Sequence, residues 1–224
     1  MEYRVNGILH RTDGPAYITK DVEMWFYNGK RHRENGPAVI TATSQTWYRN
    51  GKIHRSGSGG SDSGCDDGGP ALIKPGNRTW YFHGMIHRLD GPACIIDGVE
   101  YWMQYGKIHR ENDEPAVIRP DGTLEYYNYN VRHRVMGPTI IRPDGTEEYY
   151  QNGLRHRVGG PAIVRPNGER VWIFEGKCHH REMLPIGVAD EFPLCEQEHQ
   201  SYQIDVFEMY SEESEYLDMS EYLC

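Results

Sequence analysis

The stretch that decides the fold is residues 25–40, which read WFYNGKRHRENGPAVI. It holds an aromatic run, an Asn-Gly pair, a His-Arg pair and Gly-Pro-Ala, followed by two apolar residues. The same order of residue types recurs along the chain. We therefore interpret residues 25–40 as part of one unit of an internal repeat.

A His-Arg pair marks each repeat. Successive pairs lie 22 to 24 residues apart, except for one interval of 33 residues. The pairs begin at His10, His32, His54, His87, His109, His133 and His156, and an altered eighth copy surrounds His179. An aromatic residue stands seven positions before each histidine: Tyr3, Trp25, Trp47, Trp80, Trp102, Tyr126, Tyr149 and Trp172. This spacing predicts about eight similar units.

The Asn-Gly pair predicts a tight hairpin inside each unit. Asn28-Gly29 has the preferred chemistry for a two-residue hairpin loop with positive φ at both positions. Counting outward from it pairs Tyr27 with Lys30 and places Trp25 directly across from His32. Residues opposite each other on paired strands are in contact distance. We expect each repeat histidine to pack against the facing aromatic.

A second turn follows each Gly-Pro-Ala. Nested pairing leaves Asp97 and Gly98 as a two-residue loop, and residues 120–122 as a three-residue loop in the next repeat. Both counts place a small alanine opposite the repeat aromatic. Alanine, aromatic and histidine should then form one row across three strand segments. The row comprises Ala93, Ala116, Trp25, Trp47, Trp80, Trp102, Tyr126, Tyr149, His32, His54, His87, His109, His133 and His156.

The Gly-Pro step predicts a break or bulge in the strands, because proline cannot donate to a sheet ladder. Three positions after each proline stands an Ile or Val, as at Ile95, which we expect on the alanine face. One hairpin cannot bury its own apolar face, so neighbouring units must stack. The sequence predicts an all-β fold, an elongated meander of about eight stacked β-hairpins in a single-layer twisted sheet.

These residues resemble the MORN repeat family, whose units are β-hairpins of roughly 23 residues. The resemblance covers residues 3–185 and is to a variant with His-Arg-x-x-Gly-Pro-Ala in place of the usual His-Gly. In that form the chain resembles repeat proteins of large DNA viruses of amoebae. The resemblance implies a scaffold or docking surface, plausibly in a virion or facing the host.

Composition divides the chain near residue 185. Residues 1–181 carry a net charge of +3, whereas the remainder has 12 acidic residues and no Lys or Arg. We predict a repeat domain at 1–185, with a flexible insertion at 56–67, and an acidic tail at 186–224. Loose helical spacing of apolar residues favours a helix at 201–223. We expect the tail to cap the unpaired edge of the last hairpin, so that deleting it makes the chains associate with one another. The alternative is that the tail binds a partner.

The cysteines and the hydropathy pattern bear on location. Five cysteines, at positions 65, 94, 178, 195 and 224, are odd in number and do not follow the repeat. This favours a reducing compartment, either the cytoplasm or a virion, over a disulfide framework. No apolar run approaches the ~18 residues of a membrane span, and we expect no signal peptide.

Catalysis and metal binding are disfavoured by the repeat geometry. Equivalent histidines two strands apart are about 9–10 Å apart, too far to share an ion. No carboxylate or nucleophile recurs at a fixed offset from these histidines. We therefore expect no enzyme activity, no cofactor and no metal along the row of histidines. One cluster, Cys178, His180, Cys195 and His199, could bind zinc, although its spacing matches no standard finger.

The arginine after each histidine should lie on the opposite face, where aromatic residues alternate with it. We interpret these residues as a possible partner surface, with bonding to carbonyls at the Gly-Pro break as the competing interpretation. A net charge of +3 disfavours nucleic acid. The surface comprises Arg33, Arg55, Arg88, Arg110, Arg134, Arg157, Tyr48, Tyr81, Tyr127 and Tyr150.

The sequence therefore favours a non-enzymatic repeat scaffold that binds a protein partner, for example a capsid or host protein. Two alternatives stay open. One is a toxin-neutralising or immunity-type binder, because related repeats occur beside bacterial toxins. The other is a peripheral phosphoinositide-binding protein, as in some MORN proteins.

Overall fold

The computed structural model describes residues 1–55 and 68–183. Every regular element in these ranges is a β-strand, which confirms the predicted all-β fold. The chain divides into a first unit, Met1–Ala189, and a second unit, Asp190–Cys224. The insertion at 56–67, the acidic tail and its helix lie outside the described residues, so these predictions stay predictions.

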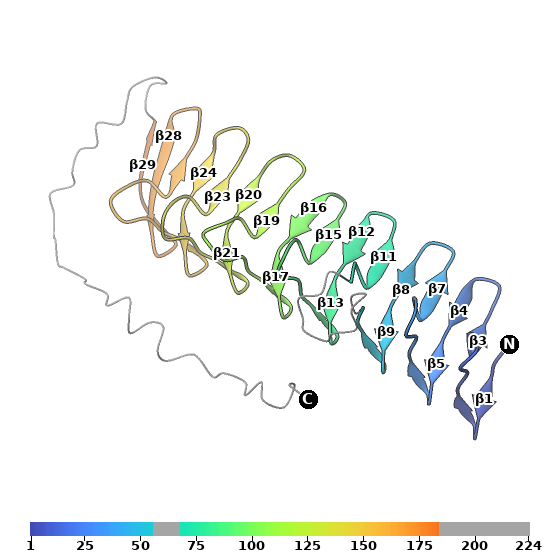
Figure 1. The fold of residues 1–224 in the computed structure, drawn as a ribbon. Coiled ribbons are helices and arrows are strands. Elements are labelled where there is room, and N and C mark those ends of the chain that lie inside the picture. The colour runs from blue at the N-terminus through green and yellow to red at the C-terminus, as the bar shows by residue number, and fades with distance from the viewer. Residues whose placement is uncertain (56–67, 184–224) are drawn as a thin grey trace, which may run out of the picture. The chain divides into compact units, whose positions relative to one another are not determined.

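Most strands belong to one 15-stranded antiparallel sheet, whose spatial order follows the chain (Figure 1). The sheet is a meander, as predicted. Its strands are β3 (Tyr17–Ile18), β4 (Val22–Met24), β7 (Val39–Thr41), β8 (Gln45–Thr46), β11 (Leu72–Lys74), β12 (Asn77–Thr79), β15 (Cys94–Ile96), β16 (Val99–Tyr101), β19 (Val117–Ile118), β20 (Leu124–Glu125), β23 (Ile140–Ile141), β24 (Glu147–Glu148), β27 (Ile163–Val164), β28 (Glu169–Phe174) and β29 (Lys177–Met183).

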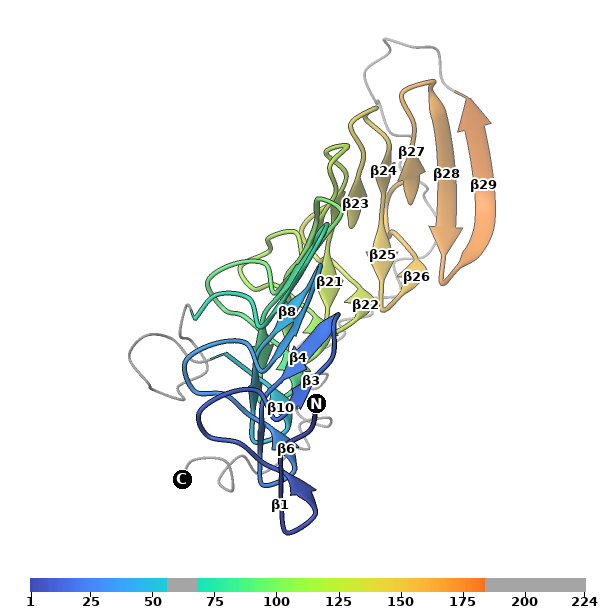
Figure 2. The ribbon, with the colours of Figure 1, turned by 90° about the vertical axis from the view of Figure 1, so that its right-hand side faces the viewer.

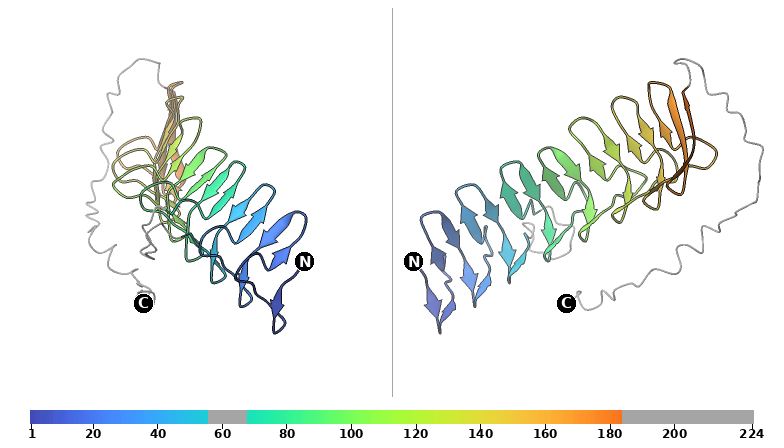
Figure 3. Two further views of the ribbon diagram at one scale, coloured as in Figure 1. Left: turned by 45° about the vertical axis from the view of Figure 1, so that its right-hand side comes forward. Right: turned by 180° about the vertical axis from the view of Figure 1, so that it is seen from behind.

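Small two-stranded hairpins form a second row beside this sheet (Figure 2). Each contains the Asn-Gly turn or its equivalent. The hairpins are β1–β2 (Arg4–Val5, Ile8–Leu9), β5–β6 (Phe26–Tyr27, Lys30–Arg31), β9–β10 (Tyr48–Arg49, Lys52–Ile53), β13–β14 (Tyr81–Phe82, Met85–Ile86), β17–β18 (Met103–Gln104, Lys107–Ile108), β21–β22 (Tyr127–Asn128, Val131–Arg132) and β25–β26 (Tyr150–Gln151, Leu154–Arg155). Each of these repeats therefore contributes to both rows (Figure 3).

Both predicted turns are present. Tyr27 pairs with Lys30, and the turn residues have the expected positive φ, 47° for Asn28 and 76° for Gly29. The second turn is a two-residue loop in the repeat where Ile96 pairs with Val99. The next repeat has the three-residue loop, closed where the Arg119 N–H donates to the Thr123 carbonyl at 3.0 Å.

The repeat alanines are completely buried, as their size suggests, but their partners differ from the prediction. The Ala93 N–H donates to the Tyr101 carbonyl at 2.8 Å, and the Ala93 carbonyl accepts from Trp80 at 2.8 Å. The Trp102 N–H, predicted to face Ala93, donates instead to the carbonyl of Ala116, the alanine of its own repeat. In the repeats from Trp25 to Tyr149 the main-sheet strand ends one residue before the aromatic, so the alanine joins two neighbouring repeats.

In four repeats the apolar residue directly after the alanine, or after Thr139 in its place, is also buried, a position that the sequence analysis did not single out. Cys94, Val117, Ile140 and Ile163 are 2% to 5% exposed, whereas the predicted residues such as Ile95 are half-buried. The buried position faces Thr79, Glu125 or Glu148 on the neighbouring strands. Both faces of the sheet are thus partly covered.

Candidate binding surface of the repeats

Each repeat arginine lies over the repeat aromatic, which corrects the predicted arrangement of the His-Arg pair. The Arg33 guanidinium carbon lies 3.9 Å from the centre of the Trp25 ring. The other pairs measure 3.7 to 4.4 Å: Arg11–Tyr3, Arg55–Trp47, Arg88–Trp80, Arg110–Trp102, Arg134–Tyr126 and Arg157–Tyr149. A guanidinium at this distance interacts favourably with the ring face. The arginine and not the histidine therefore covers the repeat aromatic.

The same arginines hold the Gly-Pro loops. Arg33 Nη1 donates to the Pro37 carbonyl at 3.1 Å, and the equivalent bond recurs from Arg157 to Pro161. The interpretation that arginine bonds carbonyls at the Gly-Pro break is confirmed. The glycine leaves room for the arginine, because a Cβ on Gly91 would lie 2.8 Å from the Arg88 guanidinium carbon.

Six repeat histidines join their hairpin to the next one, whereas the Nδ1 of the seventh, His109, is buried without a partner among the described residues. The Asn28 N–H donates to His10 Nδ1 at 3.1 Å, and Gly29 beside it donates to the Leu9 carbonyl at 2.9 Å. The Tyr105 N–H donates to His87 Nδ1 at 3.2 Å. Equivalent bonds join Asn50 to His32, His83 to His54, Asn152 to His133 and Glu175 to His156. We call this row of bonds the histidine ladder.

The His32 N–H donates to the Trp25 carbonyl at 3.2 Å, so the histidine lies across from the repeat aromatic as predicted. The rings, however, lie against a ring of the next hairpin in five repeats, those of His10, His54, His87, His109 and His156. Ring centroids are 4.3 Å apart for His87 and Tyr105, and 4.0 Å apart for His109 and Tyr129. In the altered last copy, Trp172 does face His180, at 5.0 Å. Within the described ranges the histidine ladder links successive repeats. Each Nδ1 in it accepts a hydrogen bond from a backbone N–H, which requires the neutral imidazole.

Because neutral imidazole is required, we expect stability to fall when the pH drops below about 6.5, the ordinary pKa of histidine. Burial lowers the pKa of both His87 and His109 in the folded chain. The unfolded chain therefore takes up protons at a higher pH than the folded one. The contribution of these neutral histidines to the free energy of unfolding is complete above about pH 6.5. It is lost as the pH falls through their lowered pKa values in the folded chain.

Urea midpoints followed between about pH 7.5 and about pH 5.5 measure this loss. The His87→Gln variant is the control, because it removes one titrating group while keeping a polar side chain. Its midpoint should depend less on pH than that of the wild-type chain. Equal slopes for the two proteins would show that His87 does not contribute to the pH dependence.

Two buried glutamates organise a second network that the sequence analysis missed. Glu125 is 3% exposed and accepts hydrogen bonds from Arg119 Nε at 2.7 Å, Arg132 Nη2 at 3.0 Å and the Tyr127 hydroxyl at 3.0 Å. Burial alone would raise the pKa of Glu125, but these bonds outweigh it and hold the pKa below the ordinary value.

The next repeat repeats the network around Glu148. Arg142 and Arg155 form ion pairs with its carboxylate, and the Tyr150 hydroxyl donates to it at 2.9 Å. Both glutamates stand one residue before a repeat aromatic, and Arg119 and Arg142 precede a Pro-Asp-Gly turn. That recurring offset was the available sequence signal.

The predicted partner surface is therefore not formed as one row. Its arginines lie over the repeat aromatics, while Tyr127 and Tyr150 bond the buried glutamates. The Tyr48 hydroxyl accepts from Arg31 at 3.4 Å, and burial raises the pKa of the half-buried Tyr81. The tyrosines belong to the framework of the sheet.

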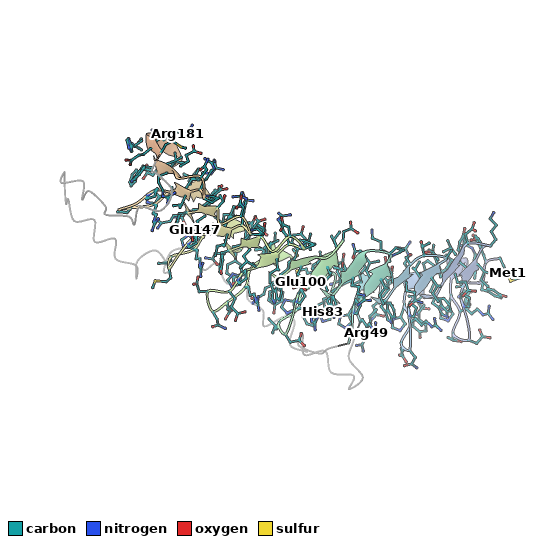
Figure 4. The ribbon with its side chains drawn as sticks, turned by 90° about the horizontal axis from the view of Figure 1, so that it is seen from above. Met1, Arg49, His83, Glu100, Glu147 and Arg181 are labelled. Atoms are coloured by element: carbon teal, nitrogen blue, oxygen red, sulfur yellow. The ribbon has the colours of Figure 1, made fainter. Side chains whose placement is uncertain are left out.

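Grooves lie between successive His-Arg loops. One of about 700 Å³ is lined by residues 11–14 and 32–35 together with Trp25. Another of about 500 Å³ is lined by residues 88–91 and 109–112 together with Trp102. Figure 4 shows the side chains of the repeats from above, with Met1 and Arg181 labelled near the two ends of the row. The repeats thus present open hollows between protruding loops.

Residues 1–55 and 68–183 contain no group of three or more His, Cys, Asp or Glu arranged to hold a metal ion. The predicted zinc cluster needs Cys195 and His199, which lie outside those ranges. The same ranges contain no helix long and apolar enough to span a membrane.

No protein-family model matches the chain, and no curated protein matches it. The resemblance to MORN repeats stays a prediction.

Proposed function

We propose that the chain is a non-enzymatic repeat scaffold that binds a protein partner through its exposed loops. The observation that supports this function is the division of labour within the repeat. The recurring alanine, aromatic, histidine and arginine are engaged in burial, stacking and backbone hydrogen bonds. Between each His-Arg pair and the following proline, the residues change from one repeat to the next.

These variable residues are all exposed. They are residues 12–13, 34–35, 89–90, 111–114, 135–136 and 158–159. A constant framework that presents varied loops is the arrangement by which repeat proteins build extended binding surfaces. Function commonly resides in loops that a rigid scaffold positions. The loops and the grooves between them are therefore the surface that we assign to the partner.

Affinity purification of the full chain from cells that produce it, followed by binding of the purified partner, tests the proposal. Capsid and host proteins are the first candidates, as the resemblance suggests. The test variant carries serine at Val135, Met136 and Val158, and the control carries serine at the exposed Val5 and Ile8 of the first hairpin.

Loss of binding in the loop variant, with binding retained in the control, would support the scaffold. A toxin domain as the partner would indicate neutralisation. Binding to phosphoinositide vesicles, without any protein partner, would replace the proposal with a peripheral membrane function. Turnover of a captured molecule would contradict the non-enzymatic role.

A further inference from the structure

The stacked arginine of several repeats already holds a carboxylate. Arg88 Nε donates to Asp90 Oδ1 at 2.8 Å. Arg134 holds Asp113 more fully, with Nε at 2.9 Å from Oδ1 and Nη2 at 2.8 Å from Oδ2. Paired N–H bonds of this kind are the strongest way for arginine to bind a carboxylate. The outer edge of the stacked guanidinium is therefore a carboxylate receptor.

Asp113 shows that the carboxylate can come from a different repeat. Asp113 lies in the loop of the repeat before Arg134, and its carboxylate accepts hydrogen bonds from Arg134. The guanidinium carbon of Arg134 lies 3.7 Å from the centre of the Tyr126 ring. Two features hold Arg134 in place: the ring below it and the Pro138 carbonyl, which accepts from Nη1 at 3.0 Å. A guanidinium fixed in this way loses little further freedom when it binds.

Arg157 has the same support but no carboxylate. Its guanidinium carbon lies 3.8 Å from the Tyr149 ring centre, and Nη1 donates to the Pro161 carbonyl at 3.1 Å. Among residues 1–55 and 68–183, no acidic side chain pairs with Arg157. The two residues that follow it are Val158 and Gly159, which carry no charge.

The surroundings of Arg157 are apolar and exposed. Val158 is 74% exposed. Asp113 lies in the loop one repeat before Arg134, and the corresponding loop one repeat before Arg157 contains Val135 and Met136. Their side chains are 70% and 81% exposed. An arginine beside apolar side chains that exclude water is the composition typical of binding hot spots.

Arg55 and Arg33 also lack an acidic partner among the described residues. The loop that follows Arg55 lies outside those residues, and the surroundings of Arg33 argue against it. Asp13 and Glu34 line the groove beside Arg33. Their negative charge opposes the approach of a further carboxylate. Arg157 has no such charge in its own loop.

We propose that Arg157, with Val135, Met136 and Val158, is the docking site for an acidic peptide segment of a partner protein. An Asp or Glu side chain of that segment binds Nε and Nη2 of Arg157, as Asp113 binds Arg134. Its apolar neighbours in the peptide cover Val135, Met136 and Val158. This inference rests on the proposed scaffold function and specifies the class of partner.

Fluorescence anisotropy on the full chain tests the site. The probe is a labelled, end-capped peptide in which Asp-Leu pairs are separated by glycine. We expect saturable binding that Arg157→Gln weakens by about tenfold or more, through loss of the charge-assisted hydrogen bonds. Lys30→Gln is the matched control. It removes the same charge from an exposed position on hairpin strand β6 and should change the affinity by less than about twofold.

A second probe replaces each Asp with Asn, and we expect it not to bind. The inference is overturned if the acidic probe does not bind, if Arg157→Gln binds it as well as the wild type does, or if Lys30→Gln is equally impaired. A protein partner that is retained by Arg157→Gln would overturn this site and leave the scaffold function standing. Binding of acidic lipid vesicles, but not of the peptide, would also overturn it.

Discussion

Ala116→Leu should destabilise the fold by about 3 kcal/mol, the upper end of the range for methylenes added to a well-packed interior. Ala116 is completely buried in the middle of the sheet. Its carbonyl accepts from the Trp102 N–H at 2.8 Å and its N–H donates to the Glu125 carbonyl at 3.0 Å, so the chain segments on both sides fix its backbone. The backbone cannot move aside to admit a larger side chain without breaking these bonds. The urea midpoint of the purified chain measures the loss.

The sequence itself supplies the control. Thr139 occupies the alanine position of the next repeat and is also completely buried. Its Oγ1 donates to the Tyr150 carbonyl at 3.1 Å and accepts from the Tyr150 N–H at 2.9 Å. Ala116→Thr should therefore cost much less than Ala116→Leu. A leucine variant as stable as the threonine variant would show that this position has room to spare.

The elements set by local chemistry were predictable from the sequence. The Asn28-Gly29 turn and its nested pairs depend on residues within one hairpin. The second turns follow from counting between an alanine and an aromatic. The repeat itself then indicates that the units share one architecture, and a meander is the simplest way to connect them.

The environment of the His-Arg pair was not predictable by the same reasoning. The predicted pairing holds as far as His32, whose N–H donates to the Trp25 carbonyl at 3.2 Å, but the Arg33 N–H donates to the Tyr48 carbonyl of the next hairpin at 3.2 Å. Beyond His32 the chain turns toward the Gly-Pro step, and the Arg33 side chain folds over Trp25. The histidine contacts depend on the neighbouring repeat, and pairing within one hairpin contains no information about it.

The buried glutamates show the same limit on the other face of the sheet. Burying a carboxylate is costly unless it is paired, so Glu125 is an unexpected core residue until its partners are known. Of those partners, Arg119 directly precedes the Pro-Asp-Gly turn of the main sheet and Arg132 lies on hairpin strand β22. Single-strand patterns do not reveal such a grouping, whereas recurrence at Glu148 could have suggested it.

The second large effect concerns this network. Glu148→Gln should destabilise the fold by about 2–3 kcal/mol, because it leaves Arg142 and Arg155 without their buried counter-charge. The Glu148 side chain is 6% exposed, whereas those of Arg142 and Arg155 are 37% and 46% exposed. Water can therefore solvate the arginines in part, and the expected loss is smaller than for a fully buried pair.

Glu147→Gln is the matched control, since it makes the same chemical change one residue earlier. Glu147 is half-buried and accepts a hydrogen bond from the Tyr149 hydroxyl at 3.1 Å. We expect it to cost less than about 1 kcal/mol, the usual value of one such bond.

Hydrogen bonds and ion pairs hold the pKa of Glu148 below its ordinary value even though burial opposes them. The wild-type chain should then lose stability as the pH falls below about 4.5, and Glu148→Gln should lose less over that range. Equal urea midpoints for the two variants, or identical acid profiles for Glu148→Gln and the wild type, would show that Glu148 is not the organising charge of this face.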